Sequence, residues 1–256
     1  MKKLASRVSA ASALAALVLL VIAMGFCETS SASVVGQLSR MQVENTGSPT
    51  YQVFGQVEDF CSGTMISPRL VLTAGHCVFD LETGKAIPVH KFTPGRNQKF
   101  EPYGSIDVVK IHVAREYTMG DTSRDIAILV LKEPVGMQTG WLSIAWDHST
   151  LPPHNSALGG WSGPGTIVGY PGDKTSKTMW LVACDFYVAP TAQRLPQYTC
   201  DTFGGMSGSS LVGGNARGQA MIFGVHTTGH GEFNSGVMLT GANKIFLQNV
   251  MKLYAL

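Results

Sequence analysis

Short segments rich in β-branched, aromatic and aliphatic residues recur along most of this chain. Several of them are continuous apolar runs, which are typical of strands that are buried on both faces. Turn signals such as Pro94-Gly95 and Pro171-Gly172 separate these segments. The pattern predicts an all-β sandwich or barrel, with strands at residues 69–73, 108–113, 126–132, 166–170, 179–188 and 221–226.

The C-terminal segment has a different periodicity. Over residues 243–256 the apolar side chains of Phe246, Val250, Leu253 and Tyr254 recur near a period of 3.6 residues. This spacing places them on one face of a helix. We therefore predict an α-helix over 243–256 that packs against the rest of the protein through that face.

The N-terminus has the order of features found in a secretory signal peptide. Basic residues come first, an apolar run follows over 13–26, and small residues lie at 30–32. The apolar run is shorter than the roughly 18 residues of a spanning helix, so an uncleaved anchor is the weaker alternative. Lipid attachment at Cys27 is disfavoured because the bulky Phe26 precedes it. We predict a signal peptide over 1–32 and a secreted, extracellular protein.

Positive and negative charges balance once this leader is removed. Cleavage after Ala32 leaves residues 33–256, which suffice for one large all-β domain or two packed barrels. The basic residues fall from 19 to 16 and the acidic ones from 17 to 16. This balance gives no electrostatic footprint for nucleic acid or an anionic membrane, so we expect neither partner, and we expect a monomer. The charges removed are Lys2, Lys3, Arg7 and Glu28.

Four cysteines remain after cleavage. An even number in an exported chain predicts two disulfides, with three possible connectivities. Proximity in the sequence favours pairing within the first two and within the last two. Zinc is the rival explanation, but no CxxC spacing supports it, so we expect no metal and no other cofactor. The cysteines are Cys61, Cys77, Cys184 and Cys200.

Three local motifs carry candidate chemistry. TAGHC at 73–77 ends a β-branched segment with a histidine, and RDIAIL at 124–129 begins an apolar strand with a carboxylate. GGMSGS at 204–209 surrounds a serine with glycines, which permit a tight loop and close approach of a substrate backbone. Each motif alone has an ordinary structural explanation. Their joint occurrence in this order predicts a catalytic triad.

A serine hydroxyl needs a base to remove its proton, and the base needs an acceptor to fix its tautomer. We predict Ser207 as the nucleophile, His76 as the base and Asp125 as the acceptor that orients it. The oxyanion of the tetrahedral intermediate also needs fixed donors. The backbone N–H groups of Gly205 and Ser207 are the candidates for this oxyanion hole.

Together, TAGHC, RDIAIL and GGMSGS resemble the motifs of the chymotrypsin-like serine peptidases. This resemblance implies two packed six-stranded antiparallel β-barrels with the active site between them. It also implies that Cys61 pairs with Cys77 beside the histidine. The Pro- and Ser-rich stretch at 149–162 is the candidate connection between the two halves, which gives an N-terminal barrel at 33–148, a C-terminal barrel at 163–242 and the helix at 243–256.

The chain further resembles the bacterial glutamyl endopeptidases, through SVVG at 33, PGRN at 94, PYGS at 102, GYPGDK at 169 and DTFGGMSGS at 201. The resemblance implies cleavage of protein or peptide substrates after Glu, and less readily after Asp. It also implies a carboxylate pocket formed by Thr202, His226 and the amine of Ser33. An ionised Glu loses hydration in a pocket, and charge-assisted hydrogen bonds offset that loss.

Two alternatives stay open. The same triad could have another primary specificity, with His226 a structural core residue. The fold could also be an inert binding module, although no triad residue or motif glycine is missing here. The other histidines lack a comparable motif, and we expect surface or structural roles for His90, His112, His148, His154 and His230.

Overall fold

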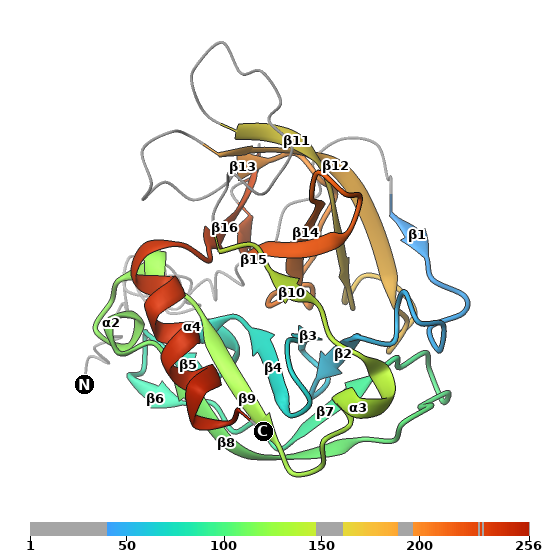
Figure 1. Cartoon of the computed structure of the whole chain (residues 1–256), viewed down its shortest axis with the longest axis horizontal. Helices are drawn as coiled ribbons and strands as arrows, with labels where there is room; N and C mark the ends of the chain where they lie inside the picture. The colour runs from blue at the N-terminus through green and yellow to red at the C-terminus, as the bar shows by residue number, and fades with distance from the viewer. Residues whose placement is uncertain (1–39, 147–160, 189–196, 230, 232, 256) are drawn as a thin grey trace, which may run out of the picture. The chain divides into compact units, whose positions relative to one another are not determined.

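The computed structural model describes residues 40–146, 161–188, 197–229, 231 and 233–255. Several predicted features lie outside these residues: the signal peptide, Ser33, most of the 149–162 connection, and the histidines His148, His154 and His230. The described residues form two closed six-stranded β-barrels followed by a C-terminal helix (Figure 1). The predicted fold class is therefore confirmed.

The first barrel closes in the order β2-β3-β4-β9-β8-β7. Strands β4 and β9 are buried at every position, as their continuous apolar sequences require. Three predicted strands, at 69–73, 108–113 and 126–132, fall on β4, β8 and β9. The bounds are β2 (Phe54–Val57), β3 (Cys61–Met65), β4 (Leu70–Thr73), β7 (Lys91–Pro94), β8 (Ile106–Val113) and β9 (Ala127–Leu131).

The second barrel runs in the order β12-β11-β14-β15-β16-β13 and closes through the pairing of β13 with β12. The predicted strands at 166–170, 179–188 and 221–226 fall on β11, β12 and β15. A short strand, β10 (Ser143–Ile144), pairs in parallel with β15. The barrel strands are β11 (Trp161–Gly169), β12 (Trp180–Val188), β13 (Gln197–Tyr198), β14 (Ser210–Gly214), β15 (Ala220–Gly229) and β16 (Asn234–Met238).

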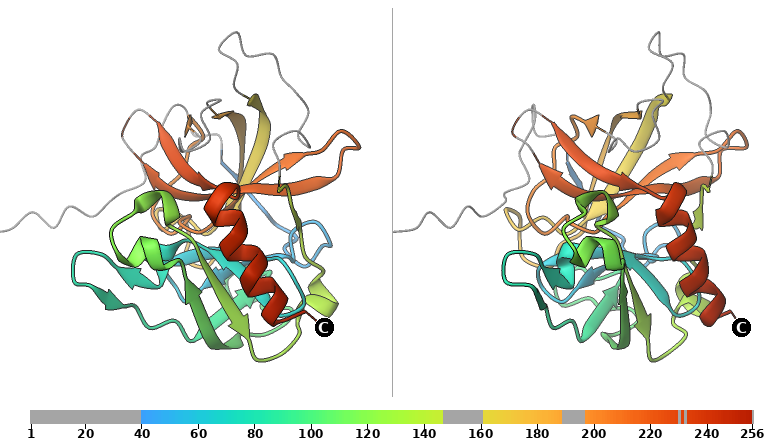
Figure 2. Two further views of the ribbon diagram at one scale, coloured as in Figure 1. Left: turned by 60° about the vertical axis from the view of Figure 1, so that its left-hand side comes forward. Right: turned by 90° about the vertical axis from the view of Figure 1, so that its left-hand side faces the viewer.

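Each end of the described chain packs against the barrel formed by the other half of the sequence. Strand β1 (Met41–Gln42) pairs antiparallel with β12, so this N-terminal segment extends the sheet of the second barrel. The helix α4 (Gly241–Leu253) instead runs along the first barrel, as the views in Figure 2 show. Its Leu247 and Val250 belong to the same apolar core as the first-barrel strands.

Short elements connect the barrel strands. Two of them position residues of the predicted triad, since His76 lies in η1 and Asp125 directly follows η2 as its C-cap. The connecting elements are η1 (Gly75–Cys77), β5 (Phe79–Asp80), β6 (Lys85–Ala86), α2 (Arg115–Thr118), η2 (Thr122–Arg124) and α3 (Gly136–Thr139).

Among the helices of the described segments, none is both long enough and apolar enough to cross a membrane.

Candidate active site

Asp125 holds His76 through both of its carboxylate oxygens. Oδ1 accepts the backbone N–H of His76 at 2.8 Å, and Oδ2 lies 2.8 Å from the ring Nδ1. Because an ionised carboxylate only accepts hydrogen bonds, this contact assigns the ring proton to Nδ1 and leaves Nε2 as the proton acceptor. The side chain of Asp125 is 7% exposed, whereas that of His76 is 33% exposed. The ring therefore has the tautomer and the access that a general base needs.

The pairing of β4 with β9 explains how these two residues meet. Thr73 lies opposite Ala127 in the antiparallel ladder. The chain leaves β4 through η1 at the same end where η2 leads into β9, so His76 and Asp125 face each other. Gly75 is required between them, since a Cβ there would lie 3.0 Å from Oδ1 of Asp125.

The loop that carries Ser207 lies against the first barrel. The carbonyl oxygen of Ser207 accepts the N–H of Ser62 at 2.8 Å, and the Ser62 hydroxyl donates to the carbonyl of Gly205 at 2.8 Å. Gly205 and Gly208 have φ values of +97° and +82°, which favour glycine. A Cβ on Gly208 would lie 2.2 Å from Oγ1 of Thr73, on the strand that leads to His76.

The structure thus brings the three predicted motifs together. Sγ of Cys77, the residue after His76, lies 3.8 Å from the carbonyl oxygen of Ser207. Ser207 itself is half-buried. Within the described segments, no hydrogen bond is found for the N–H groups of Gly205 and Ser207, the two proposed oxyanion donors.

His226 lies fully buried on β15, beside the serine loop. Its backbone N–H donates to Ser209 at 2.8 Å, and its carbonyl accepts the N–H of Gly208 at 2.9 Å. Its Nδ1 lies 2.5 Å from the hydroxyl of Tyr198. Burial, followed by the charge of His76, lowers the pKa of His226 to about 3, so the ring is neutral at ordinary pH.

Two buried polar atoms of the predicted carboxylate pocket have no partner among the described residues. They are Nε2 of His226 and Oγ1 of Thr202. Both residues are 0% exposed. A buried polar atom without a partner costs free energy, so a ligand or water that satisfies it is expected. The third predicted member, Ser33, lies outside the described residues.

Two disulfides connect the four cysteines. One joins Cys61 to Cys77, with Cα atoms 6.2 Å apart, and fastens the histidine turn to β3. The other joins Cys184 on β12 to Cys200, two residues before Thr202, with Cα atoms 5.3 Å apart. The pairing favoured by sequence proximity is the one observed.

Among the described residues, one cluster of potential metal ligands does not fit a metal site. Cys61, His76 and Cys77 place their ligand atoms within 4.8 Å of one another, but the two sulfurs are joined in a disulfide and are not thiolates. The HTTGH segment from His226 has an HxxxH spacing. Its second histidine, His230, lies outside the described residues.

Comparison with known proteins identifies the family. The sequence profile of the trypsin family matches residues 39–245. The chain belongs to the trypsin family of serine endopeptidases. It is 32% identical over 219 residues to a glutamyl endopeptidase of Bacillus licheniformis, an alignment that covers 81% of this chain and 66% of that protein. It is 28% identical over 224 residues to a Bacillus subtilis protein named extracellular metalloprotease, covering 84% of this chain and 67% of that one.

These figures mean that the chain spans about two thirds of the length of the curated relatives it matches. Solved structures agree on the fold. A Glu endopeptidase structure superposes with a TM-score of 0.70 at 28% identity, covering 85% of this chain and 98% of that one. The protease Anisep from Arthrobacter nicotinovorans gives 0.62 at 17% identity, covering 82% and 98%.

An ion network at Arg40 of this trypsin-family chain was not predicted from the sequence. The guanidinium of Arg40 binds both oxygens of Asp173 at 2.7 Å and Oδ2 of Asp201 at 3.0 Å. Burial alone lowers the pKa of Arg40, but its hydrogen bonds to the two carboxylates outweigh that effect and raise it. Both acids lie in motifs quoted above, GYPGDK and DTFGGMSGS, so the sequence indicated that these two carboxylates were of interest. Their partner was not identifiable.

A second missed residue is Asn243, near the start of α4. Its side-chain N–H groups donate to the carbonyls of Ser123 and Met238 at 3.1 and 2.8 Å, and its oxygen accepts from Arg124. Arg124 directly precedes Asp125. The C-terminal helix therefore holds the turn that presents the candidate triad carboxylate.

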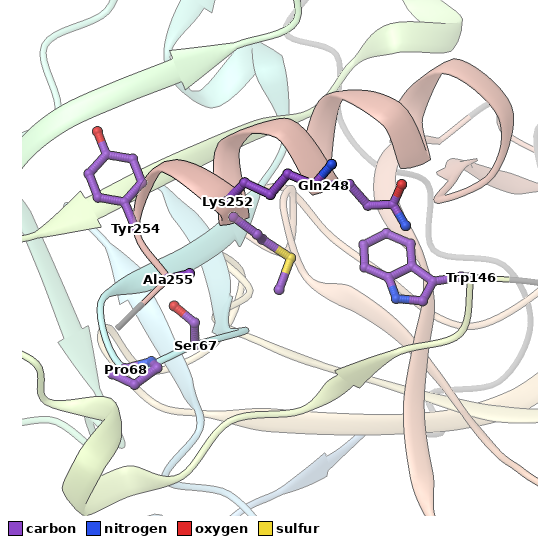
Figure 3. A pocket seen from close by; sticks show the side chains of 8 residues that line it. Ser67, Pro68, Trp146, Gln248, Lys252, Tyr254 and Ala255 are labelled. Atoms are coloured by element: carbon purple, nitrogen blue, oxygen red, sulfur yellow. The ribbon is translucent and has the colours of Figure 1, made fainter.

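A cavity of about 460 Å³ lies away from these residues, at the C-terminal end of α4 (Figure 3). It contains none of the candidate catalytic or pocket residues. Its lining is Ser67, Pro68, Trp146, Gln248, Met251, Lys252, Tyr254 and Ala255.

Proposed function

We propose that this protein is a secreted serine endopeptidase that cleaves peptide bonds after Glu, and less readily after Asp. The catalytic part of this proposal depends on the contacts of both Asp125 carboxylate oxygens with His76. The Ser207 loop packs against the same turn. The substrates would be proteins or peptides.

In this mechanism Oγ of Ser207 attacks the scissile carbonyl carbon while Nε2 of His76 takes the hydroxyl proton. Asp125 stabilises the imidazolium that results. The N–H groups of Gly205 and Ser207 would donate to the oxyanion. The C–N bond then breaks as His76 gives its proton to the leaving amine. Water, activated by the same imidazole, hydrolyses the acyl-enzyme and frees Ser207.

The preference for Glu is supported by two buried polar atoms that have no partner among the described residues. Oγ1 of Thr202 and Nε2 of His226 are polar atoms that a carboxylate would satisfy. The amine of Ser33 would add a positive charge after removal of the leader. Since the ring of His226 is neutral, Nε2 must carry its proton in order to donate.

Matched peptides with Glu, Asp, Gln, Lys or Phe before the scissile bond test this proposal. We expect Glu first and Asp second in kcat/KM. Ser207→Ala should abolish turnover while the protein still unfolds cooperatively. A Lys or Phe preference would overturn the specificity, and persistent turnover in Ser207→Ala would overturn the choice of nucleophile.

His226→Leu separates the Glu-specific pocket from the alternative in which His226 is only structural. Loss of the Glu preference with retained cleavage of neutral peptides supports the pocket. An unchanged Glu preference in this variant rejects it. Labelling by a fluorophosphonate addresses the remaining alternative, because an inert binding module would not react at Ser207.

Export and maturation complete the proposal. The leader at 1–32 and the two disulfides support an extracellular location, where disulfides persist. N-terminal sequencing of the secreted protein should identify Ser33 as the first residue. If the mature chain begins several residues away from Ser33, the α-amine cannot have the proposed role in the pocket. Gel filtration would test the expected monomer.

A further inference from the structure

We propose that Tyr198 is a specificity-determining positioning residue, whose hydroxyl decides which ring nitrogen of His226 carries the proton. This inference rests on the proposed Glu pocket and deepens it. If Tyr198 donates to Nδ1, the ring presents an N–H at Nε2 and can bind a carboxylate. If Tyr198 donates elsewhere, Nε2 presents a lone pair and cannot.

The position of the Tyr198 hydroxyl is fixed by its surroundings. Tyr198 is 2% exposed, and its strand β13 pairs on one side with Phe186 and on the other with Asn234. Its ring packs against Phe186, with ring centroids 4.9 Å apart. The hydroxyl therefore has little freedom to leave His226.

The hydroxyl has one proton and two acceptors within reach. Its oxygen lies 2.5 Å from Nδ1 of His226 and 3.0 Å from the carbonyl oxygen of Ser235. Burial raises the pKa of Tyr198 well above its usual value, so the proton stays on the hydroxyl. A carbonyl oxygen can only accept, so each choice of acceptor dictates the tautomer of the ring.

In the first arrangement Tyr198 donates to Ser235, and Nδ1–H of His226 donates to the Tyr198 oxygen. Nε2 is then a bare acceptor, which a carboxylate avoids and which the amide N–H of a Gln side chain would satisfy. In the second arrangement Tyr198 donates to Nδ1, and the ring proton resides on Nε2. An acidic side chain selects this second arrangement, with no net change in the number of protons on the ring.

The nearby carbonyl makes the role of Tyr198 specific. Without the hydroxyl, Nδ1 has no donor, and the Ser235 carbonyl is the acceptor that remains on that side of the ring. That acceptor favours Nδ1–H and therefore a bare Nε2. Tyr198→Phe should thus bias the pocket from Glu toward Gln without any change in the triad.

The test is kcat/KM for matched Glu and Gln peptides in the wild type and in Tyr198→Phe. Loss of a hydrogen bond to a charged ligand corresponds to roughly a 10- to 100-fold effect. We expect the Glu:Gln ratio to fall at least about tenfold, mainly through a higher KM for Glu. A ratio within about twofold of wild type, in a protein that reacts fully with a fluorophosphonate, overturns the proposal.

Tyr187→Phe is the matched control, because Tyr187 lies on the neighbouring strand, opposite Gln197, and is half-buried. It should leave the ratio unchanged. His226→Leu distinguishes failure of the proposed Tyr198 role from failure of the Glu pocket itself. If it abolishes Glu preference while Tyr198→Phe does not, the role of Tyr198 fails and the pocket stands. If neither changes the ratio, the pocket fails as well.

If Tyr198→Phe does not fold, the proposal can still be tested in a protein that keeps Tyr198. ¹⁵N NMR of the histidine rings reports which nitrogen is protonated. In Ser207→Ala bound to an uncleaved Glu peptide, we expect the proton of His226 on Nε2. A proton that stays on Nδ1 in this complex overturns the proposal.

Discussion

The buried guanidinium of Arg40 donates to Asp201 across 161 residues of sequence, and Asp201 directly precedes Thr202. This bond joins the N-terminal segment to the loop that contains the candidate pocket and the candidate nucleophile. Neither side chain of the pair is exposed. The consequence is that Arg40 and the adjacent strand β1 are fastened to the second barrel.

Arg40→Met should destabilise the protein substantially. It removes the positive charge and leaves two carboxylates, one of them fully buried, without their partner. Breaking a buried ion pair in this way costs about 3–5 kcal/mol. Urea unfolding measures the loss. Arg115→Met, at an exposed position, is the control, and a loss below about 1 kcal/mol for Arg40→Met would contradict the structural role.

Asp125→Asn should lower kcat by about four orders of magnitude, with little change in stability. The amide can keep one contact with His76, but it no longer accepts through both oxygens, so the ring loses its tautomer and the stabilisation of its charged form. Peptide hydrolysis measures the effect. Asp121→Asn, an exposed change in the adjacent η2 turn, should retain activity. Comparable activity in both variants would exclude Asp125 from the triad.

Gly75→Ala should reduce kcat/KM by up to about 100-fold, which is the effect of displacing a catalytic group by about 1 Å. The added Cβ would lie 2.8 Å from the ring of Tyr117 and 3.0 Å from Oδ1 of Asp125, so the carboxylate must move away from His76. Gly214→Ala is the control, since its Cβ meets nothing within 4 Å. Unimpaired turnover in Gly75→Ala would show that this contact does not position Asp125.

The stability of the protein should fall in acid because of His226. Burial, followed by the charge of His76, lowers its pKa from 6.5 to about 3, so below pH 6.5 the unfolded chain binds a proton that the folded chain does not. This contribution is complete above pH 6.5 and is lost as the pH falls toward 3. Between pH 7 and pH 4 the loss is about 3 kcal/mol.

Urea unfolding at both pH values, with wild type and His226→Leu, isolates this effect. The variant lacks the titrating group, so its stability should change less between pH 7 and pH 4. An equal loss in both proteins would show that His226 is not the source. His90→Leu serves as the control, because His90 is exposed.

Local patterns predicted the C-terminal helix and six of the barrel strands, namely β4, β8, β9, β11, β12 and β15. Continuous apolar runs marked β4, β9 and β12, and the helical period marked α4, which runs over Gly241–Leu253 where 243–256 was predicted. The candidate triad was also visible, because His76, Asp125 and Ser207 each lie in a short motif whose residue types suit one step of the chemistry. The motifs contain glycine at 75, 205 and 208 because a Cβ there would meet neighbouring atoms, and because 205 and 208 have positive φ angles.

The partners of these residues depended on the tertiary structure. Nothing near Arg40 in the sequence indicates Asp173 or Asp201, and nothing near His226 indicates Tyr198. Each contact joins segments that meet only when a barrel closes. The sequence by itself therefore determined which segments become strands and which residues are chemically suited to catalysis, since these follow from local composition and spacing. Only the folded chain decided which buried donors face which acceptors, because burial makes an unpaired polar group costly and long-range packing selects its partner.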